Sequence, residues 1–235
     1  MPADPLPVLV FDINETLSDL TPLRGRFADI GAPGHLLETW FAGVLRDGFA
    51  LTAAGAYADF TDVARHGVQT VLSKLEDWTG DDEAAAQHIL EGFTDLDTHP
   101  DVPDGIRRLS EAGYRLTAMT NGSAALTERL LHKAGVLDCF ESLSDVSGPQ
   151  CWKPAPAAYQ YTTEGAGVRP DQAMMIAVHP WDIDGAQRAG LEGAWLRRGA
   201  STYPQTMTPP DHVARDLQEL ADTLAADGRT ATPTE

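Results

Sequence analysis

PVLVFDINETL, residues 7–17, is the stretch that decides the fold. Its residues 8–11 are consecutive and apolar, and three of the four are β-branched or aromatic, which predicts a short strand buried on both faces. Asp12 ends this strand, and Asn14 just beyond it is a typical turn residue. Because ligands of an open parallel sheet bind at the carboxyl ends of its strands, Asp12 would lie next to a substrate. The alternative is that Asp12 only caps a turn or the next helix.

The rest of the chain divides into a helical part and an alternating part. Residues 17–99 carry apolar side chains at helical spacing and contain no convincing strand, which indicates a helical insertion. From residue 99 onward strands and helices alternate, which predicts an α/β fold with a doubly wound parallel sheet. The expected strands are 114–119, 140–144, 173–178 and 193–197, and the expected helices are 104–112, 124–134, 154–165, 183–189 and 216–226.

Composition narrows the function classes. The 235 residues are 43% hydrophobic and 22% charged, as in an ordinary globular protein. With 35 acidic against 17 basic residues, the net charge is −18, which argues against nucleic acid and anionic membranes as partners. A small anionic substrate can still bind where a few Lys or Arg side chains converge.

The N-terminus lacks the features of a signal peptide and no stretch is long enough for a membrane span, so we expect a cytoplasmic protein.

Polar residues follow the predicted strands at their carboxyl ends. They are Asp12, Thr16, Thr120, Asn121, Lys153, His179 and Asp182. Each has a structural alternative: Thr120 and Asn121 as helix caps, Lys153 as a surface lysine, His179 as a turn residue, and Asp182 as the cap of a helix. Their gathering at one edge of one parallel sheet is a stronger signal than any single position.

These residue types together suit nucleophilic chemistry. A carboxylate such as Asp12 is a nucleophile when a cation lowers its pKa, and Lys153 is the natural counter-ion. Backbone amides around Asn121 and Ser123, at a predicted helix N-terminus, would hold a substrate carboxylate or phosphate. Asp182 could accept a proton from a water that hydrolyses the resulting ester.

The ordered set of these positions resembles the haloacid dehalogenase superfamily. The four motifs of that superfamily would be residues 8–16, 120–123, 152–154 and 178–182. The resemblance covers nearly the whole chain and implies a Rossmann-like catalytic core with an inserted helical cap. The implied division is a core of residues 1–16 and 97–226, a cap of 17–96, and a polar tail of 227–235 that we expect to be disordered.

Two signatures of the superfamily's phosphatases are missing. Those phosphatases carry an Asp two residues after the nucleophile, whereas this chain has Asn14, which cannot transfer a proton. The first Asp of their acidic, Mg²⁺-holding loop is Val178 here. We therefore expect no metal site and no cofactor.

The remaining pattern looks like the L-2-haloacid dehalogenases. Residues 120–123 match their Ser-Asn-Gly-Ser loop, with Thr120 replacing the first Ser, and Trp181 with Asp182 matches their Trp-Asp pair. The resemblance implies that Asp12 attacks C2 of a short 2-haloalkanoic acid and expels halide. It also implies that Lys153 stabilises the charge and that water, activated near Asp182, then hydrolyses the aspartyl ester. Thr16 and Tyr159 would position the nucleophile and substrate.

Four positions depart from that family's pattern. Asn14 replaces an aromatic residue, and Ala177 replaces the loop Ser. His179 replaces the loop Asn, and a ring that titrates near neutrality could help the hydrolytic step there. Phe41, after Trp40, replaces the cap arginine that receives the halide, for which Arg24 or Arg46 could substitute. Candidate substrate contacts are Asn14, Thr120, Trp40, Phe41 and Trp181. Trp40 and Phe41 also fit a purely structural role between cap helices.

Two further functions stay open on sequence alone. One is a phosphatase of the same superfamily, and the other is a catalytically silent member that binds a small anion without bond breaking. The resemblance is also compatible with a homodimer, since dimerisation through cap or core helices is common for such folds.

Overall fold

The computed structural model describes residues 6–199 and 201–226. Within these residues one six-stranded sheet has the order β3-β2-β1-β4-β5-β6, and all of its neighbouring strands are parallel. The strands are β1 (Val8–Phe11), β2 (Leu116–Thr120), β3 (Phe140–Asp145), β4 (Ala173–Ala177), β5 (Glu192–Leu196) and β6 (His212–Ala214). The predicted α/β fold with a doubly wound parallel sheet is confirmed.

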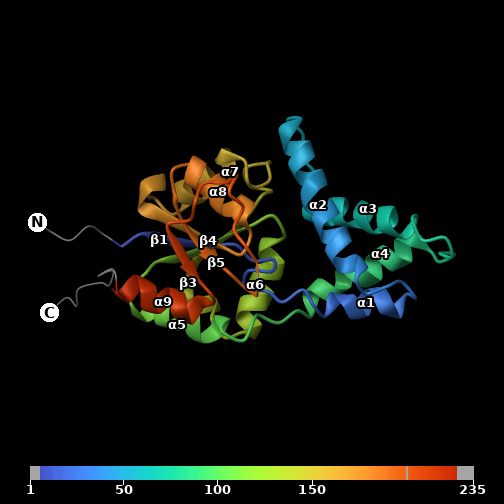
Figure 1. The fold of residues 1–235 in the computed structure, drawn as a ribbon, viewed down its shortest axis with the longest axis horizontal. Helices are drawn as coiled ribbons and strands as arrows, with labels where there is room; N and C mark the ends of the chain where they lie inside the picture. Colours follow the sequence, from blue (N-terminus) through green and yellow to red (C-terminus); the bar gives the residue numbers. More distant parts are fainter. Residues whose placement is uncertain (1–5, 200, 227–235) are drawn as a thin grey trace, which may run out of the picture.

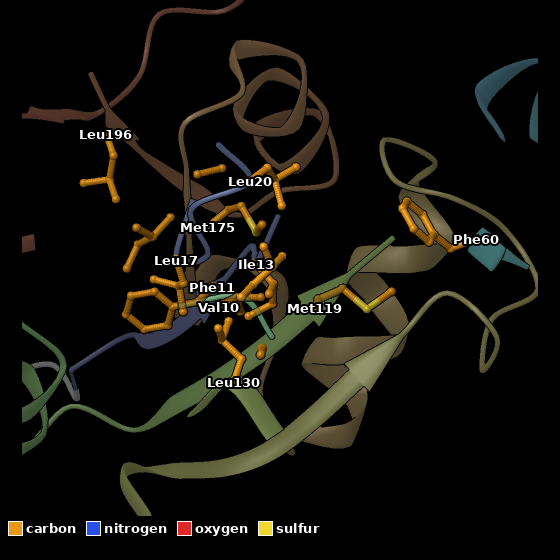
Figure 2. Packing of buried hydrophobic residues seen from close by; sticks show 14 of the residues in the cluster. Val10, Phe11, Ile13, Leu17, Leu20, Phe60, Met119, Leu130, Met175 and Leu196 are labelled. Carbon is orange, nitrogen blue, oxygen red and sulfur yellow. The ribbon is translucent and has the colours of Figure 1, made fainter. Parts of the chain in front are cut away.

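Strand β1 lies in the middle of the sheet, between β2 and β4. All of its residues are buried, as a strand covered on both faces must be. Figure 2 shows Val10 and Phe11 of β1 packed close to Met119 of β2 and Met175 of β4, all of them buried. This packing fixes the position of Asp12, the next residue of the chain.

Helices cover both faces of the sheet. In Figure 1, α7 and α8 lie on one side of it, and α5 and α9 lie on the other. The chain runs outward from β1 to β3 and then returns to β4, so the connections reverse direction between β1 and β4. The carboxyl ends of these two strands therefore form the crevice where open α/β sheets bind ligands. The helices are α5 (Val102–Glu111), α6 (Ala124–Lys133), α7 (Pro156–Gly165), α8 (Pro180–Arg188) and α9 (Leu217–Ala226), with 3₁₀ turns η2 (Leu137–Cys139) and η3 (Pro170–Gln172).

Four further helices are inserted between β1 and α5. They lie together, apart from the sheet, in Figure 1. They are α1 (Leu23–Asp29), α2 (Leu36–Ala53), α3 (Phe60–Leu72) and α4 (Asp82–Glu91), followed by the 3₁₀ turn η1 (Gly92–Thr94). Side chains of Asp59 and Asp81 cap α3 and α4 by accepting hydrogen bonds from backbone N–H groups of the first turns. The division into a cap of 17–96 and a core of 1–16 and 97–226 stays a prediction.

Trp152 joins the inserted helices to the sheet. Its backbone N–H donates to Thr52 Oγ1 at 3.0 Å, and its indole Nε1–H donates to the Ala58 carbonyl at 2.9 Å. The ring also stacks on Phe60, with centroids 6.2 Å apart and planes at 26°. Because Lys153 follows directly, these contacts tie the backbone of Lys153 to α2 and α3.

Two elements differ from the sequence-based expectation. Helix α8 begins at Pro180 rather than at residue 183, because proline is preorganised for a first helical turn and His179 takes the cap position in extended backbone. Asp182 therefore lies inside the first turn of α8 and is not its cap. Strand β6 was not predicted, since three residues between a proline-rich loop and a helix carry no periodicity.

The predicted disordered tail of 227–235 lies outside the described residues. None of the helices in the described part of the chain has the length and apolar character needed to cross a membrane.

Candidate active site

Two side chains hold the Asp12 carboxylate at the end of β1 by hydrogen bonds. Its Oδ1 accepts a hydrogen bond from Lys153 Nζ at 2.9 Å, and its Oδ2 accepts one from Thr16 Oγ1 at 2.6 Å. Thr16 Oγ1 in turn accepts from the backbone N–H of Val178 at 3.1 Å, which links the loop after β1 to the end of β4. Burial raises the pKa of Asp12, but attraction to Lys153 and His179 outweighs it and leaves the pKa below its usual range. Asp12 is thus an ionised, immobilised carboxylate.

Lys153 is completely buried, which excludes the surface-lysine alternative. Its ammonium bridges two carboxylates, Asp12 at 2.9 Å and Asp182 at 2.6 Å. Burial lowers the pKa of Lys153, but the two carboxylates raise it by more, so the lysine stays charged. Asn121 fixes the lysine backbone, since its Oδ1 accepts from Lys153 N at 2.9 Å and its Nδ2 donates to Lys153 O at 3.2 Å.

Asp182 completes a buried chain of charges. Its Oδ1 accepts from the Tyr159 hydroxyl at 2.7 Å, while its Oδ2 accepts from Lys153. Burial and repulsion from Asp12 raise the pKa of Asp182, although Lys153 opposes them. Burial and the neighbouring Asp182 also raise the pKa of Tyr159 well above its usual value, so Tyr159 is a neutral donor. Both oxygens of Asp182 are therefore already engaged.

His179 approaches Oδ2 of Asp12, the carboxylate oxygen that Lys153 does not contact. Its Nδ1 lies 3.3 Å from Asp12 Oδ2, without hydrogen-bonding geometry, and its Nε2 lies 2.8 Å from Glu15 Oε2. The ring stacks on Trp181, with centroids 5.1 Å apart. Burial lowers the pKa of His179, but the close Asp12 and Glu15 carboxylates, the second of them hydrogen-bonded to Nε2, outweigh it and raise the pKa to about 9.

A small cavity lies next to the loop after β2. Its volume is about 20 Å³, room for about one water-sized group, and its lining includes Asn14, Thr120, Gly122, Ser123 and Phe60. Thr120 Oγ1 accepts from the Gly122 N–H at 2.9 Å. A Cβ at Gly122 would come within 3.1 Å of the Asn14 amide nitrogen, so this close approach favours glycine. The structure thus brings Asn14 together with Thr120, at the N-terminal end of α6.

A larger cavity of about 410 Å³ borders His179 and is called the His179 cavity below. Its lining includes His179, Glu15, His99, Asp19, Arg24, Phe41 and Arg198. Of the two arginines proposed as halide partners, Arg24 lies on this wall, where it pairs with Glu38. Arg46 is exposed and pairs with Asp47 at 2.8 Å.

Trp40 and Phe41, adjacent in sequence, have different surroundings. Trp40 is fully buried, its Nε1–H donates to the Ala64 carbonyl at 2.9 Å, and its ring contacts Phe27 and Phe93. This placement favours the structural role weighed for Trp40. Phe41 reaches the wall of the His179 cavity.

Sequence reasoning missed two residues that the structure brings to the site. Glu15 contacts His179 through its side chain, and its backbone has a φ of +63°. Arg198 follows β5, donates to the Thr16 carbonyl at 3.1 and 3.0 Å, and pairs with Asp101 at 2.8 Å. Arg198 could have been found from sequence, because it is a polar residue just after a strand, like the other site residues. Glu15 could not, because no sequence feature indicates its left-handed backbone conformation.

Within residues 6–199 and 201–226 no group of three or more His, Cys, Asp or Glu side chains is arranged to hold a metal ion. Metal independence itself stays a prediction.

The haloacid dehalogenase-like hydrolase family model matches residues 6–190 of this chain. The (S)-2-haloacid dehalogenase 4A of Burkholderia cepacia is 27% identical over 227 residues, covering 94% of this chain and 96% of that protein. Haloacetate dehalogenase H-2 of Moraxella sp. (strain B) is 25% identical over 171 residues, covering 73% of this chain and 75% of that protein. The solved L-2-haloacid dehalogenase of Xanthobacter autotrophicus, with chloropropionic acid covalently bound, superposes with a TM-score of 0.85. It covers 94% of this chain and 98% of its own at 21% identity, and so shows the shared fold.

Proposed function

This chain belongs to the haloacid dehalogenase-like hydrolases, and on that premise we propose that it converts a short 2-haloalkanoic acid into the 2-hydroxy acid through an ester on Asp12. The names of its relatives, a haloacetate dehalogenase and several (S)-2-haloacid dehalogenases, support this substrate class.

The observation that carries the proposal is the setting of Asp12. Its carboxylate is buried, held ionised by Lys153, and fixed by Thr16. A desolvated and immobilised carboxylate is prepared for in-line attack on carbon. Asn14 stands where the family's phosphatases need a proton-transferring carboxylic acid, so the site favours displacement that needs no such acid.

In the first step an Asp12 oxygen forms a bond to C2 of the substrate while the carbon–halogen bond breaks. The halide leaves with the bonding electron pair, so this step needs no proton donor. We place the substrate carboxylate at the loop of Thr120 and Asn121, where the N-terminus of α6 favours an anion. Lys153 holds Asp12 in position and compensates the charge that shifts during displacement.

In the second step water attacks the carbonyl carbon of the Asp12 ester and the bond from this carbon to the product oxygen breaks. The products are the 2-hydroxy acid, the regenerated carboxylate and one proton. The net reaction consumes one water and releases one halide ion and one proton.

Halide release tests the proposal. The substrates are monochloro-, monobromo- and monofluoroacetate and both 2-chloropropionate enantiomers, each with and without EDTA. We expect release that is unaffected by EDTA and lost in Asp12→Asn. Phosphate release from an aryl phosphate that requires Mg²⁺, without halide release from any acid, would contradict the proposal and favour a phosphatase. Binding of these acids without release of either ion would favour the silent anion-binding alternative.

A further inference from the structure

His179 stands between the nucleophile and the His179 cavity. Its Nε2 is 2.8 Å from a carboxylate oxygen of Glu15, and its Nδ1 is 3.3 Å from Asp12 Oδ2. Nδ1 is buried without a hydrogen-bond partner, although the side chain as a whole is 14% exposed where it borders the cavity. This nitrogen is therefore aimed at the carboxyl group that carries the ester in the proposed reaction.

The hydrogen bond between Nε2 and Glu15 determines whether Nδ1 of the neutral ring carries a hydrogen. A carboxylate only accepts hydrogen bonds, so Nε2 must carry the hydrogen that Glu15 receives. In the neutral ring Nδ1 is then a bare lone pair facing Asp12. Beside an ionised carboxylate this lone pair is repelled unless it is protonated. Beside a neutral ester the repulsion disappears, and Nδ1 is free to act as a base.

Glu15 reaches His179 from a strained backbone. Its φ of +63° lies in the left-handed region, which non-glycine residues rarely adopt. The turn is held from outside, because His99 Nε2–H donates to the Glu15 carbonyl at 3.0 Å. In this conformation the side chain of Glu15 meets the imidazole of His179.

Asp182 is less suited to activating the water. Both of its oxygens accept short hydrogen bonds, from Tyr159 at 2.7 Å and from Lys153 at 2.6 Å, and the residue is completely buried. A water would have to displace one of these donors. By contrast, His179 Nδ1 has no hydrogen-bond partner and lies 3.3 Å from the carboxyl group of Asp12.

We propose that His179 is the general base of ester hydrolysis, that Glu15 is its positioning residue, and that the His179 cavity supplies the water. This inference rests on the proposed function. During attack, the water oxygen bonds to the ester carbonyl carbon and one water proton moves to His179 Nδ1. When the bond to the product oxygen breaks, His179 returns that proton to the product oxygen, and the hydroxyl proton left on the new Asp12 carboxyl goes to solvent.

The charges around His179 support this cycle. The anions that face its ring are Asp12 and Glu15, while Lys153 lies on the far oxygen of Asp12 and His99 and Arg198 line the cavity. Asp12 and Glu15 raise the pKa of His179 to about 9, so the resting ring is protonated at neutral pH. Esterification removes the charge of Asp12 and so lowers the pKa of His179, and the ring then releases its resting proton to solvent and can act as a base. The ring binds a proton again once hydrolysis has restored the charge of Asp12.

An NMR titration of His179 tests the coupling without substrate. The Asp12→Asn variant imitates the neutral ester, and we expect the His179 pKa to fall by at least one unit relative to wild type. In Glu15→Gln it should fall as well. As a control, Asp19→Asn makes the same acid-to-amide change on the cavity wall without touching His179, and should leave the titration unchanged. An unchanged His179 pKa in Asp12→Asn would overturn the pairing.

Rapid-quench kinetics with monochloroacetate test the step. We expect His179→Gln, Glu15→Gln and Glu15→Gly to release about one equivalent of chloride at the wild-type rate and then slow at least tenfold, with the Asp12 ester accumulating in peptide mass spectra. Glu15→Gly relieves the backbone strain, so its slowing cannot be ascribed to misfolding. Wild-type turnover in these variants, or a slowed first equivalent, would overturn the inference. Absence of chloride from the wild type would overturn the proposed function, and with it the hydrolytic role, whatever the titration shows.

Discussion

Gly48 of α2 lies against the indole ring of Trp152, the residue before the buried Lys153. A Cβ at position 48 would overlap the six-membered part of that ring. The Trp152 ring cannot easily retreat, because it is fully buried and bonded to the Ala58 carbonyl. The absence of a side chain at position 48 of α2 thus helps set the position of the lysine that contacts Asp12.

Substituting Gly48→Ala should lower both stability and turnover. We expect a loss of about 1–3 kcal/mol in the free energy of unfolding, since overpacking of a tight core costs this much. Turnover should fall with it, because Trp152 carries the backbone of Lys153. Gly43→Ala on the same helix meets nothing within 4 Å and is the matched control. It should be neutral or gain up to about 1 kcal/mol from helix propensity. Urea denaturation and halide release measure both effects, and equal behaviour of the two variants would contradict this packing argument.

Replacing Lys153 by methionine should destabilise the fold as well as abolish activity. The change leaves the carboxylates of Asp12 and Asp182 buried without their shared cation, which typically costs about 3–5 kcal/mol. The control is Lys133→Met, which removes an ion pair to Asp97 from a side chain that is 49% exposed. Such surface pairs contribute about 0–1 kcal/mol. A loss below about 1 kcal/mol in Lys153→Met, measured by urea denaturation, would contradict the buried-charge account.

His179 should contribute to stability in acid and neutral solution but not in alkali. Its pKa is raised in the folded protein to about 9 from an ordinary value of 6.5, so the folded state binds the proton more tightly than the unfolded chain. The contribution is complete below the unfolded pKa and is lost as the pH rises through the folded pKa. We expect the stability difference between wild type and His179→Gln to shrink by about 3 kcal/mol from pH 6 to pH 10. A difference that is constant with pH would show that the ring is neutral in the folded state.

Glu15→Gly should be more stable than Glu15→Ala. Both variants lose the carboxylate on His179, but only glycine adopts the φ of +63° without steric cost. A left-handed conformation costs other residues about 1–2 kcal/mol, so we expect a difference of about 1 kcal/mol between the variants. Thermal unfolding of the pair at one pH measures it. Equal stability would mean that the turn does not hold this conformation in solution.

Much of the fold could be predicted because its signals are local. The apolar run of residues 8–11 is buried on both faces as expected, and polar residues after successive strands do converge around Asp12. Lys153 is an example. A lysine before a proline gives no reason to expect burial, but its position in a series of polar groups that follow the strands predicts that it lies at the site.

The remainder depends on contacts between residues distant in sequence. Asn121 was expected to bind substrate, yet its amide also fixes the backbone of Lys153, 32 positions away. Trp40 is adjacent in sequence to the cavity residue Phe41, but its ring packs between helices. Helical spacing alone cannot distinguish a residue that lines a cavity from one that packs between helices. The pair of Glu15 and His179 needs both a left-handed turn and the approach of two strand ends, and neither is visible in sequence.

The central claim, an ester on Asp12, is tested most directly by one turnover in ¹⁸O-labelled water with enzyme in excess over monochloroacetate. If water attacks the ester carbonyl, the label enters the carboxyl group of Asp12, and the hydroxyl oxygen of the product comes unlabelled from the enzyme. Mass spectrometry of the Asp12 peptide and of the 2-hydroxy acid distinguishes the two positions. We predict label in Asp12 and none in the product. Label in the product hydroxyl, with Asp12 unlabelled, would show that water displaces the halide directly and would contradict the account.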